Sequence, residues 1–483
     1  MTAAAATQPE EPAHHGHSPS VRRATLLAAC LAFFVILLDS SIVNLALVRM
    51  QEALRTDLRG LQWVVDGYAL VFASLLLTGG SLADKFGAHR LFLAGILLFT
   101  LASGLCGLAP SLGWLLAGRA FQGVGAALLL PASLTLLRAA YPDERERAHA
   151  VGLWIAAGGA ANAAGPSVGG LLITFFPWRS IFLVNLPIGA FLVWLTLRHA
   201  LRPAPNRGAH LDIAGQVLAI AALGLFTWAI IEGQDLGWGS SPIISAMAAA
   251  IAAAAGFVQV ERRTAEPMLP PDLFRGNAAA RVSVIAALHN VGIYGQLFAA
   301  GLFLQSVLGF TPLRAGMVLL PMTAAIALLA FVSGRWIARS GPYPPLNTGH
   351  AVATAGSIGL ASLAAFGNGA STPLLLLFLS AVGVGAGLAS PPMTTALLAA
   401  LPPERSGLAG GVLNTSRQIG NVFGIAVIGA IITSFGGVGS SAGYVVAWLL
   451  AAAALGTNVV LGAVLASNKR QQQAEVTIGS VSV

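Results

Sequence analysis

The sequence predicts an all-α membrane protein of fourteen transmembrane helices, arranged as two six-helix halves with two further helices inserted between them. The chain is 56% hydrophobic and only 9% charged, whereas about a quarter of the residues in ordinary soluble domains are charged. Its apolar runs of about 20 residues have the length that crosses a hydrocarbon core of about 30 Å. A partial internal repeat then divides these runs into two related sets.

The repeat consists of a glycine-rich helix and the loop that follows it. Residues 123–135 and 383–395 are identical at seven of thirteen positions. At the same offset of 260 residues a charged loop recurs, with Pro142, Glu144 and Arg145 in the first copy and Pro402, Glu404 and Arg405 in the second. Apolar helices alone produce chance matches, but a charged loop in register is harder to dismiss, so we infer two homologous halves. Many secondary transporters are built from such repeats.

Apolar run length and polar breaks place the individual helices. The first half is predicted at residues 25–47, 62–80, 91–109, 112–137, 149–174 and 180–197. The inserted pair is predicted at 212–232 and 242–260. The second half is predicted at 279–304, 313–337, 346–366, 373–400, 407–434 and 443–466. The resulting divisions are a tail (1–24), the first half (25–200), the inserted pair with its linkers (201–277), the second half (278–467) and a second tail (468–483).

The distribution of basic residues predicts the orientation, because lysine and arginine are enriched in cytoplasmic loops. With the N-terminus inside, 19 of the 26 basic residues lie on the cytoplasmic side, and Arg119 and Arg417 lie within helices. The five expected outside are Arg49, Arg55, Arg59, Arg179 and Arg314. We therefore expect both termini in the cytoplasm. The alanine-, glycine- and arginine-rich composition suits the plasma membrane of a high-GC bacterium.

Several other classes of protein are excluded. The net charge of +8 comes with no basic stripe or zinc-ligand spacing, so no nucleic acid partner is expected. Cys30 and Cys106 fall in separate apolar runs and predict neither a disulfide nor a metal site. The sequence holds no nucleophile–base set and no phosphate loop, so neither an enzyme nor a cofactor is expected. Eight of the nine histidines lie in the tail or near predicted loops, where we expect solvent: His14, His15, His17, His89, His149, His199, His210 and His350.

Two aspartates stand inside predicted helices. Asp39 lies about fifteen residues into the first helix and Asp66 a few residues into the second. A carboxylate in a membrane costs about 2.5 to 3.5 kcal/mol on insertion scales, so it usually faces a cavity or a partner and marks a proton or ion path. Burial also favours a carboxyl group that loads and releases a proton near neutral pH. The alternative is that each aspartate lies near a helix end and reaches water or caps a neighbour.

Arg119 lies one or two turns into the fourth helix, with Gln122 one turn later on nearly the same face. A buried arginine keeps its proton, so it changes the proton affinity of a nearby carboxylate by moving toward or away from it. The alternative is an arginine whose head group reaches the extracellular surface. We expect Asp39, Asp66 and Arg119 to couple protons to transport, with Asp39 the first choice. Glu232 is the rival, but its place near a helix end predicts exposure.

The loop between the second and third helices carries a glycine and charge pattern, and the residues singled out in it are Gly80, Asp84, Lys85, Gly87 and Arg90. Glycines at this spacing permit a tight turn. Asp84 can pair with basic residues across a helix boundary and so hold one conformation of the bundle. The second half repeats the glycine spacing at Gly334 and Gly341 without the aspartate.

The fifth helix carries small residues at intervals of three and four, among them Gly165, Pro166 and Gly169. Small residues at this spacing let another helix approach closely, and a proline inside a helix removes a hydrogen bond and kinks it. We expect this face to pack against a helix of the opposite half and to act as a hinge or seal.

Together these motifs resemble the major facilitator superfamily, and in particular its fourteen-helix branch of drug and proton antiporters. The resemblance covers nearly the whole chain and rests on residues 38–46, 80–90, 119–127, 165–170, 178–189 and 414–420. The last two segments are rather specific to this branch. The sequence departs from the family pattern at Ala88, where a basic residue is usual, and at Ala161, where a glycine is expected. The resemblance implies the major facilitator fold, in which two halves rock about a central cavity.

We therefore expect a monomeric, proton-coupled exporter of amphipathic small molecules, surrounded by membrane lipid. A dedicated exporter of one self-made metabolite or antibiotic is the alternative, and a membrane receptor is a more distant one. Candidate substrate contacts are polar residues at plausible depth: Asn44, Gln122, Asn162, His289, Asn290, Tyr294, Gln296 and Gln305. Each of them has the alternative of a hydrogen bond to a neighbouring helix.

Overall fold

The computed structural model describes residues 18–203, 212–264, 267, 278–401 and 406–481, and the regular secondary structure of this part is helical. The N-terminal group of helices comprises α1 (Pro19–Leu54), α2 (Leu58–Phe86), α3 (Ala88–Gly107), α4 (Leu112–Ala140), α5 (Glu144–Phe175), α6 (Ser180–Leu183) and α7 (Asn185–His199). A pair follows, α8 (Ile213–Leu236) and α9 (Ser241–Arg263). The C-terminal group comprises α10 (Ala278–Leu302), η2 (Phe303–Val307), α11 (Pro312–Ser340), α12 (Tyr343–Ala364), η3 (Gly367–Gly369), α13 (Thr372–Ala400), α14 (Ser406–Ser434) and α15 (Ser441–Val481).

Eleven of the described helices are long and apolar enough to cross a membrane, or twelve if the two arms of the bent helix α2 form one span. The short helices α6 and α7 together make one of the eleven. Helices α5 and α12 are also long, but their many glycine, alanine and polar residues lower their hydropathy. The described part of the chain is therefore all-helical with eleven or twelve candidate spans, and the predicted fourteen are not reached by this measure.

Several helices extend beyond the predicted ranges, for example α1 at Pro19–Leu54 against 25–47, and two further differences concern the sixth and the last helix. The predicted sixth helix is interrupted at Val184, which separates α6 from α7. Helix α15 continues to Val481, so most of the expected C-terminal tail is helical. The glutamine, alanine and glutamate residues of this segment have high helix propensity, which explains why the helix does not stop at the last apolar residue.

Local sequence signals explain several other helix ends. The side chains of Asp57, Asp143 and Asp212 each accept a hydrogen bond from a backbone N–H three residues later, which caps α2, α5 and α8. Gly87 follows α2 with φ of 95°, and Gly341 follows α11 with φ of 77°. Because glycine adopts positive φ without strain, the glycine spacing shared by the two loops produces a chain reversal at equivalent places.

The internal repeat has a counterpart in helix packing. A Cβ atom at Gly123 of α4 would overlap the backbone of α2, and one at Gly383 of α13 would overlap the backbone of α11. In the same way Gly125 lets α3 approach, and Gly385 lets α12 approach. The repeated glycines therefore select equivalent close helix contacts in the two groups. The repeated loop positions Pro402, Glu404 and Arg405 lie outside the described residues.

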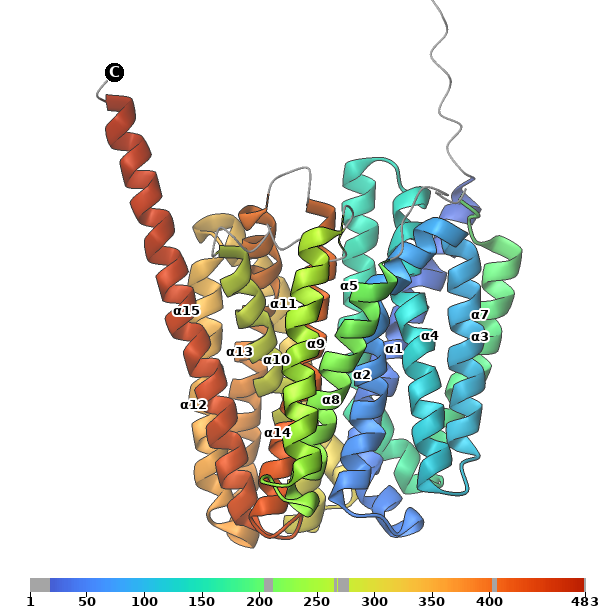
Figure 1. Ribbon diagram of the computed structural model, residues 1–483, viewed down its shortest axis with the longest axis vertical. Coiled ribbons are helices and arrows are strands. Elements are labelled where there is room, and N and C mark those ends of the chain that lie inside the picture. The colour runs from blue at the N-terminus through green and yellow to red at the C-terminus, as the bar shows by residue number, and fades with distance from the viewer. Residues whose placement is uncertain (1–17, 204–211, 265–266, 268–277, 402–405, 482–483) are drawn as a thin grey trace, which may run out of the picture.

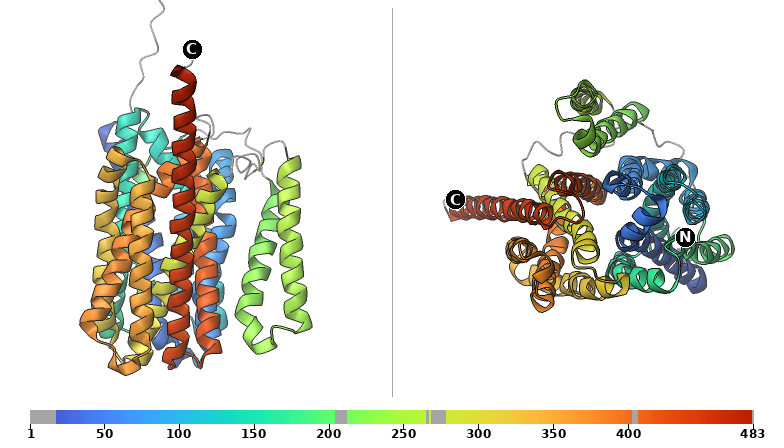
Figure 2. Two further views of the ribbon diagram at one scale, coloured as in Figure 1. Left: turned by 90° about the vertical axis from the view of Figure 1, so that its left-hand side faces the viewer. Right: turned by 90° about the horizontal axis from the view of Figure 1, so that it is seen from below.

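The two groups stand side by side and pack against each other mainly through α2 with α14 and α5 with α11 (Figures 1 and 2). Helix α1 also contacts α10 and α11. The pair α8 and α9 lies beside this bundle, where α8 packs against α2 and α14 (Figure 2). Helix α1 begins and α15 ends at the same end of the bundle (Figure 1). We call this the terminal end and the opposite one the distal end.

Candidate functional site

A buried ion pair joins α1 to α4. Arg119 Nη1 lies 2.5 Å from Asp39 Oδ2, and both side chains are fully buried. Asp39 Oδ1 accepts hydrogen bonds from Gln122 Nε2 at 3.0 Å and from Asn185 Nδ2 at 2.9 Å. Arg119 Nε donates to the backbone carbonyl of Val64 in α2 at 2.9 Å. These contacts connect α1, α2, α4 and α7, and we call Asp39, Arg119, Gln122 and Asn185 the Asp39 cluster.

The sequence left two alternatives open, an Asp39 near a helix end and an Arg119 that reaches the extracellular surface, and both are wrong. Asp39 lies in the middle of the 36-residue helix α1 and does not reach water at a helix end. Arg119 does not reach the surface either, because Asp39 neutralises its charge and its guanidinium lies over the ring of Tyr68 at 4.3 Å. Pairing and hydrogen bonding together offset the cost of burying the two charges.

Asp66 is buried without a partner. It is 0% exposed, and neither carboxylate oxygen has a hydrogen-bond partner among the described residues. One turn earlier on α2, Gln62 Nε2 donates to the carbonyl of Ala426 in α14 at 3.0 Å. This part of α2 therefore lies against the C-terminal group. An unpaired carboxylate in such a place costs free energy, and a bound proton removes that cost.

Glu232 lies near the end of α8, as predicted, but its expected exposure is wrong. Its side chain is 21% exposed. Oε1 accepts a hydrogen bond from Trp63 Nε1 at 2.9 Å, and Oε2 lies 3.3 Å from Arg59 Nη1. The first turns of α2 therefore cover Glu232, and the contacts connect α8 to α2 near the distal end.

A cavity of about 220 Å³ lies between the two groups. Helices α1, α2, α4 and α5 line one side, and α10, α11, α13 and α14 line the other. Its wall is mostly apolar and aromatic, as is usual for small-molecule sites. The polar lining residues are Asn162, His289, Asn290, Tyr294, Thr323, Ser390, Asn414, Arg417 and Gln418. Among the described lining residues, none belongs to α8 or α9, so the inserted pair does not line the cavity.

Tyr68 lies between the Asp39 cluster and the cavity. The guanidinium of Arg119 lies over its ring, and the ring centroids of Tyr68 and Phe72 are 5.9 Å apart. Phe72 in turn lines the cavity. A shift of Arg119 would therefore reach the cavity wall through one layer of aromatic side chains.

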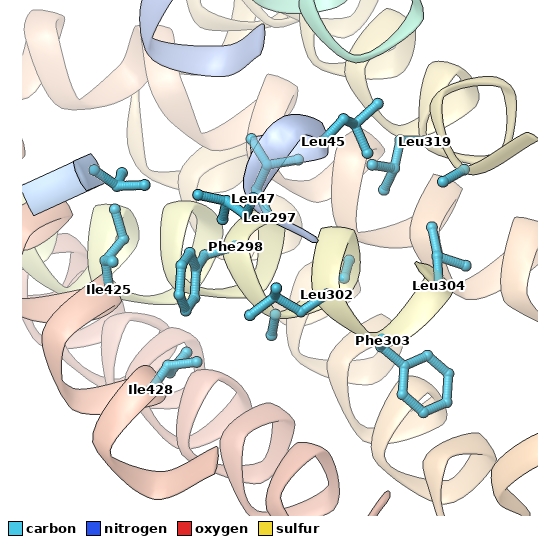
Figure 3. Close-up of a cluster of buried hydrophobic side chains, with 14 of the residues drawn as sticks. Leu45, Leu47, Leu297, Phe298, Leu302, Phe303, Leu304, Leu319, Ile425 and Ile428 are labelled. Carbon is cyan, nitrogen blue, oxygen red and sulfur yellow. The ribbon is translucent and has the colours of Figure 1, made fainter. Parts of the chain in front are cut away.

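A tightly packed apolar layer follows the cavity residues along α1, α10 and α14, on the distal side of the cavity, and Figure 3 shows its side chains. Its side chains come from α1, α10 and α14, and each is at most 3% exposed: Leu45, Leu47, Phe298, Leu302, Ile425 and Ile428. Gly301 brings α10 close to α1 at this level, since a Cβ atom there would lie 3.1 Å from the carbonyl oxygen of Asn44. The dense packing leaves this end of the bundle shut.

The structure divides the candidate substrate contacts into two sets. Those that line the cavity are Asn162, His289, Asn290 and Tyr294. Those that do not line it, and instead hydrogen-bond to protein groups, are Asn44, Gln122, Gln296 and Gln305. Asn44 donates to the carbonyl of Ser40 within α1, and Gln305 of η2 donates to the carbonyl of Gly301 in the preceding helix α10.

The expectation of solvent is wrong for His350 and His89, which are 0% and 8% exposed. His350 lies two turns into α12, where its Nε2 is 3.2 Å from Nδ1 of the cavity-lining His289. His89 lies in the first turn of α3 and contacts the carbonyl of Thr196. A histidine in the first turns of a helix is buried when it lies on the face of the helix that packs against its neighbours. His149 and His199 are exposed as expected, and the remaining four histidines that we expected in solvent lie outside the described residues.

Arg417 is a cavity residue to which sequence analysis assigned no role. Its Nη2 donates to the carbonyl of Ser390 in α13 at 3.1 Å. Among the described residues no carboxylate lies within 4 Å of it. Asn414 and Gln418 of the same helix line the cavity beside it. The sequence could have identified Arg417 as a candidate, because it is a charged residue inside a predicted transmembrane helix, as Arg119 is.

The expected packing of the α5 glycines against the opposite half is wrong for two of them. Cβ atoms at Gly165 and Gly169 would overlap Ser41 and Ile42 of α1, in the same group. These glycines therefore hold α5 against α1.

The contact between α5 and the C-terminal group uses a neighbouring face. A Cβ atom at Gly170 would lie 2.6 Å from the carbonyl oxygen of Pro312 in α11. One at Gly316 of α11 would lie 2.5 Å from the carbonyl oxygen of Pro166. Adjacent residues on a helix are rotated by about 100°, so the step from Gly169 to Gly170 changes the neighbouring helix.

The pairing expected for Asp84 is not formed in this conformation. Asp84 and Arg90 are exposed, Lys85 is half-buried, and the described residues contain no ion pair to Asp84. Gly80 has room for a side chain, whereas its neighbour Gly79 lies against the α4 backbone. Of the predicted loop features, the glycine turn at Gly87 is present.

Comparison with known proteins gives one family. A family model described as Major Facilitator Superfamily matches residues 29–425 and, in a second match, residues 282–477. The chain is 40% identical over 418 residues to the methylenomycin A resistance protein of Streptomyces coelicolor, covering 86% of each chain. It is 38% identical to the multidrug resistance protein Stp of Mycobacterium tuberculosis, covering 85% of this chain and 76% of the relative. It is 34% identical to the tetracenomycin C resistance and export protein of Streptomyces glaucescens, and the match covers 88% of this chain and 79% of that relative.

Solved structures with the same fold are more distant in sequence. One, described as "Structural insights into substrate recognition in proton dependent oligopeptide transporters", has a TM-score of 0.67 and 16% identity. The match covers 93% of this chain and 99% of that one. At this identity the likeness concerns the fold alone.

Proposed function

Since the chain belongs to the Major Facilitator Superfamily, we propose that it exports amphipathic small molecules, such as drugs or antibiotics, across the bacterial plasma membrane in exchange for protons. Relatives that share most of its length are named for resistance or export. The observation that carries the proton coupling is the Asp39 cluster, a buried carboxylate–guanidinium pair one aromatic layer from a cavity between two helix groups. Such a protein moves its substrate unchanged, and we assign it no enzymatic step.

The proposed coupling uses the charge of Asp39. A proton on Asp39 would neutralise the carboxylate and weaken its attraction for Arg119. Arg119 would then be free to shift against Tyr68 and the cavity wall. Asp66, at the contact with the C-terminal group, is the second proton carrier in this proposal, because among the described residues nothing pairs with its buried carboxylate.

The proposed conformational cycle starts from a state in which the distal end is closed. The apolar layer closes the distal end here. Opening that end requires α1 to separate from α10, and α5 from α11, while the terminal end closes. We propose that Asp84, together with Lys85, Gly87 and Arg90, stabilises the state in which the terminal end is closed. In that state Asp84 would gain the basic partner that it lacks here.

The proposed topology has fourteen spans, six in each group and two in the inserted pair, with α6 and α7 as one span. The terminal end faces the cytoplasm, because most basic residues gather there. Large apolar side chains on the outside of the bundle, such as Leu101 and Phe175, face membrane lipid. Both helix groups of the chain line the cavity, and we propose that a monomer carries out transport.

The proposal is tested with purified protein in proteoliposomes under an imposed pH gradient. Compounds of different charge are loaded, and their movement and that of protons are recorded together. We expect movement of substrate against protons, abolished when the gradient is collapsed by a protonophore. A rate of substrate movement that does not depend on the pH gradient would contradict proton coupling.

A dedicated exporter of one self-made antibiotic is a second candidate, because two of the relatives are named for single antibiotics. Expression in a drug-sensitive host distinguishes the two. A broad exporter raises resistance to several unrelated compounds, whereas a dedicated one raises it to a single compound class.

A further inference from the structure

We propose that the central cavity selects amphipathic organic anions and that Arg417 binds their negative group. This inference rests on the proposed export function and adds the charge of the substrate to it. Among the described residues, the cavity wall has one charged side chain, and it is a guanidinium without a carboxylate partner.

The two arginines inside helices differ in this respect. Arg119 has the Asp39 carboxylate at 2.5 Å. Among the described residues, the Arg417 side chain has one hydrogen-bond partner, the carbonyl of Ser390 at 3.1 Å from Nη2. A guanidinium carries five N–H donors, and none of the Arg417 nitrogens is both fully buried and unpartnered. Among the described residues the other Arg417 nitrogens have no further hydrogen-bond partner, and because the side chain lines the cavity we infer that a ligand there can reach them.

The surroundings of Arg417 suit an anion with an apolar body. Asn414 and Gln418 line the cavity beside it with amide groups, and Asn290 holds the backbone of Arg417 through a 2.8 Å hydrogen bond to its carbonyl. A guanidinium binds a carboxylate in a fixed, often bidentate geometry. The rest of the wall is apolar and includes Phe33, Phe72, Ile293 and Met322.

The same wall disfavours cations. No aspartate or glutamate is among the lining residues of the described structure. Asp39 is already neutralised by Arg119, and Asp66 does not line the cavity. A lipophilic cation would therefore find no counter-charge and would be repelled by Arg417.

The competing explanation is that Arg417 only braces α14 against α13 through Ser390. Bracing would affect every ligand alike, whereas charge recognition affects anions selectively. Ligands with one ring system and different charges therefore separate the two explanations.

The test measures binding of 1-naphthaleneacetate, 1-naphthaleneacetamide and 2-(1-naphthyl)ethylammonium to the full chain in lipid nanodiscs by equilibrium dialysis. We expect the wild-type protein to bind the acid about tenfold or more tightly than the amide, and the cation most weakly, as a charge-assisted hydrogen bond implies. Arg417→Gln should bring the acid within about twofold of the amide. Arg417→Lys should keep part of the preference, because it keeps the charge. The control Arg335→Gln removes an exposed arginine of α11 and should keep the wild-type order.

An acid that binds no better than its amide to the wild-type protein overturns the proposal. So does an equal loss of all three ligands in Arg417→Gln, because that is the bracing result. Proton-driven export of cations or neutral compounds without acids would overturn anion selection while leaving the export function intact. Arg417-dependent binding of the acid without export of any probe would support the anion site and count against the export function.

Discussion

At the residue scale, Asp39 and Asp66 are chemically the same group in opposite surroundings. Asp39 is held by Arg119, Gln122 and Asn185. Asp66 has no partner among the described residues, although it is equally buried. Pairing offsets the free-energy cost of burial in the first case, whereas in the second a bound proton would remove that cost. This difference leads to separate expectations for function and for stability.

Removing either carboxyl proton site should stop proton-driven efflux. Asn keeps nearly the shape of Asp but does not bind and release a proton, so Asp39→Asn and Asp66→Asn should abolish proton release on substrate addition and flatten the pH dependence of transport. Substrate binding should fall less. Proton release is measured with a pH indicator in weakly buffered solution. Glu232→Gln, remote from the cavity, serves as the matched control and should release protons as wild type does. Normal release in both aspartate variants would move the search to the C-terminal group, beginning with His289 and His350.

The same two variants should differ in stability. Asp39→Asn leaves Arg119 without its counter-charge, and breaking a buried pair costs about 3–5 kcal/mol. Asp66→Asn removes no partner, so its cost should stay below about 1 kcal/mol. Thermal unfolding of both purified variants in one detergent measures the difference. Equal losses would mean that Asp66 has a partner in the folded protein.

At the element scale, the contact between α5 and α11 holds the two groups together near the distal end. It depends on the absence of side chains at Gly170 and Gly316, which face backbone carbonyls of the opposing helix. On the neighbouring face, Gly165 and Gly169 hold α5 against α1. Helix α5 is therefore expected to stay packed against α1 during transport and to separate from α11.

Gly170→Leu should favour the state in which the distal end is open. The added side chain would overlap Pro312 and Leu313, and overpacking of this kind costs typically about 1–3 kcal/mol. The cost falls on the closed distal end, so spin labels on the distal ends of α5 and α11 should move apart. Gly159→Leu is the control on the same helix, because no atom lies within 4 Å of a Cβ there. Equal label distances in the two variants would show that α5 and α11 do not form the seal.

At the scale of the whole molecule, orientation follows from the distribution of charge between the two ends. The terminal end carries most of the arginines, and a cytoplasmic position of these residues fits the positive-inside tendency. The loop between α8 and α9 lies at the distal end (Figure 1), and the apolar layer lies between this end and the cavity. If the terminal end is cytoplasmic, the apolar layer is the barrier on the outer side.

Cysteine labelling in whole cells checks this orientation. In a protein whose Cys30 and Cys106 are replaced by alanine, Gly239→Cys places a thiol in the exposed loop between α8 and α9, and Ser467→Cys places one on α15 at the terminal end. A membrane-impermeant maleimide should label the first in intact cells and the second only after permeabilisation. The reverse pattern would invert the proposed topology.

Local properties of the chain were sufficient to predict much of this molecule. Hydropathy and run length predicted an all-helical membrane protein, and membrane-buried charge drew attention to Asp39, Asp66 and Arg119. The fixed offset of 260 residues predicted equivalent roles for the two glycine ladders, which pack against equivalent neighbours. Each of these inferences depends on composition or on spacing along one helix.

Which residues meet was decided by the tertiary structure. Asp39 pairs with a residue 80 positions away while Asp66 pairs with none in the described structure, Gly170 rather than Gly165 meets the opposite group, and Arg417 faces the cavity. A transmembrane helix is apolar on all sides, so its sequence does not reveal its rotation about its own axis. That rotation and the identity of the neighbouring helix are determined by packing between segments far apart in the chain. They decide whether a buried polar residue forms an ion pair, contacts a neighbouring helix or lines the cavity.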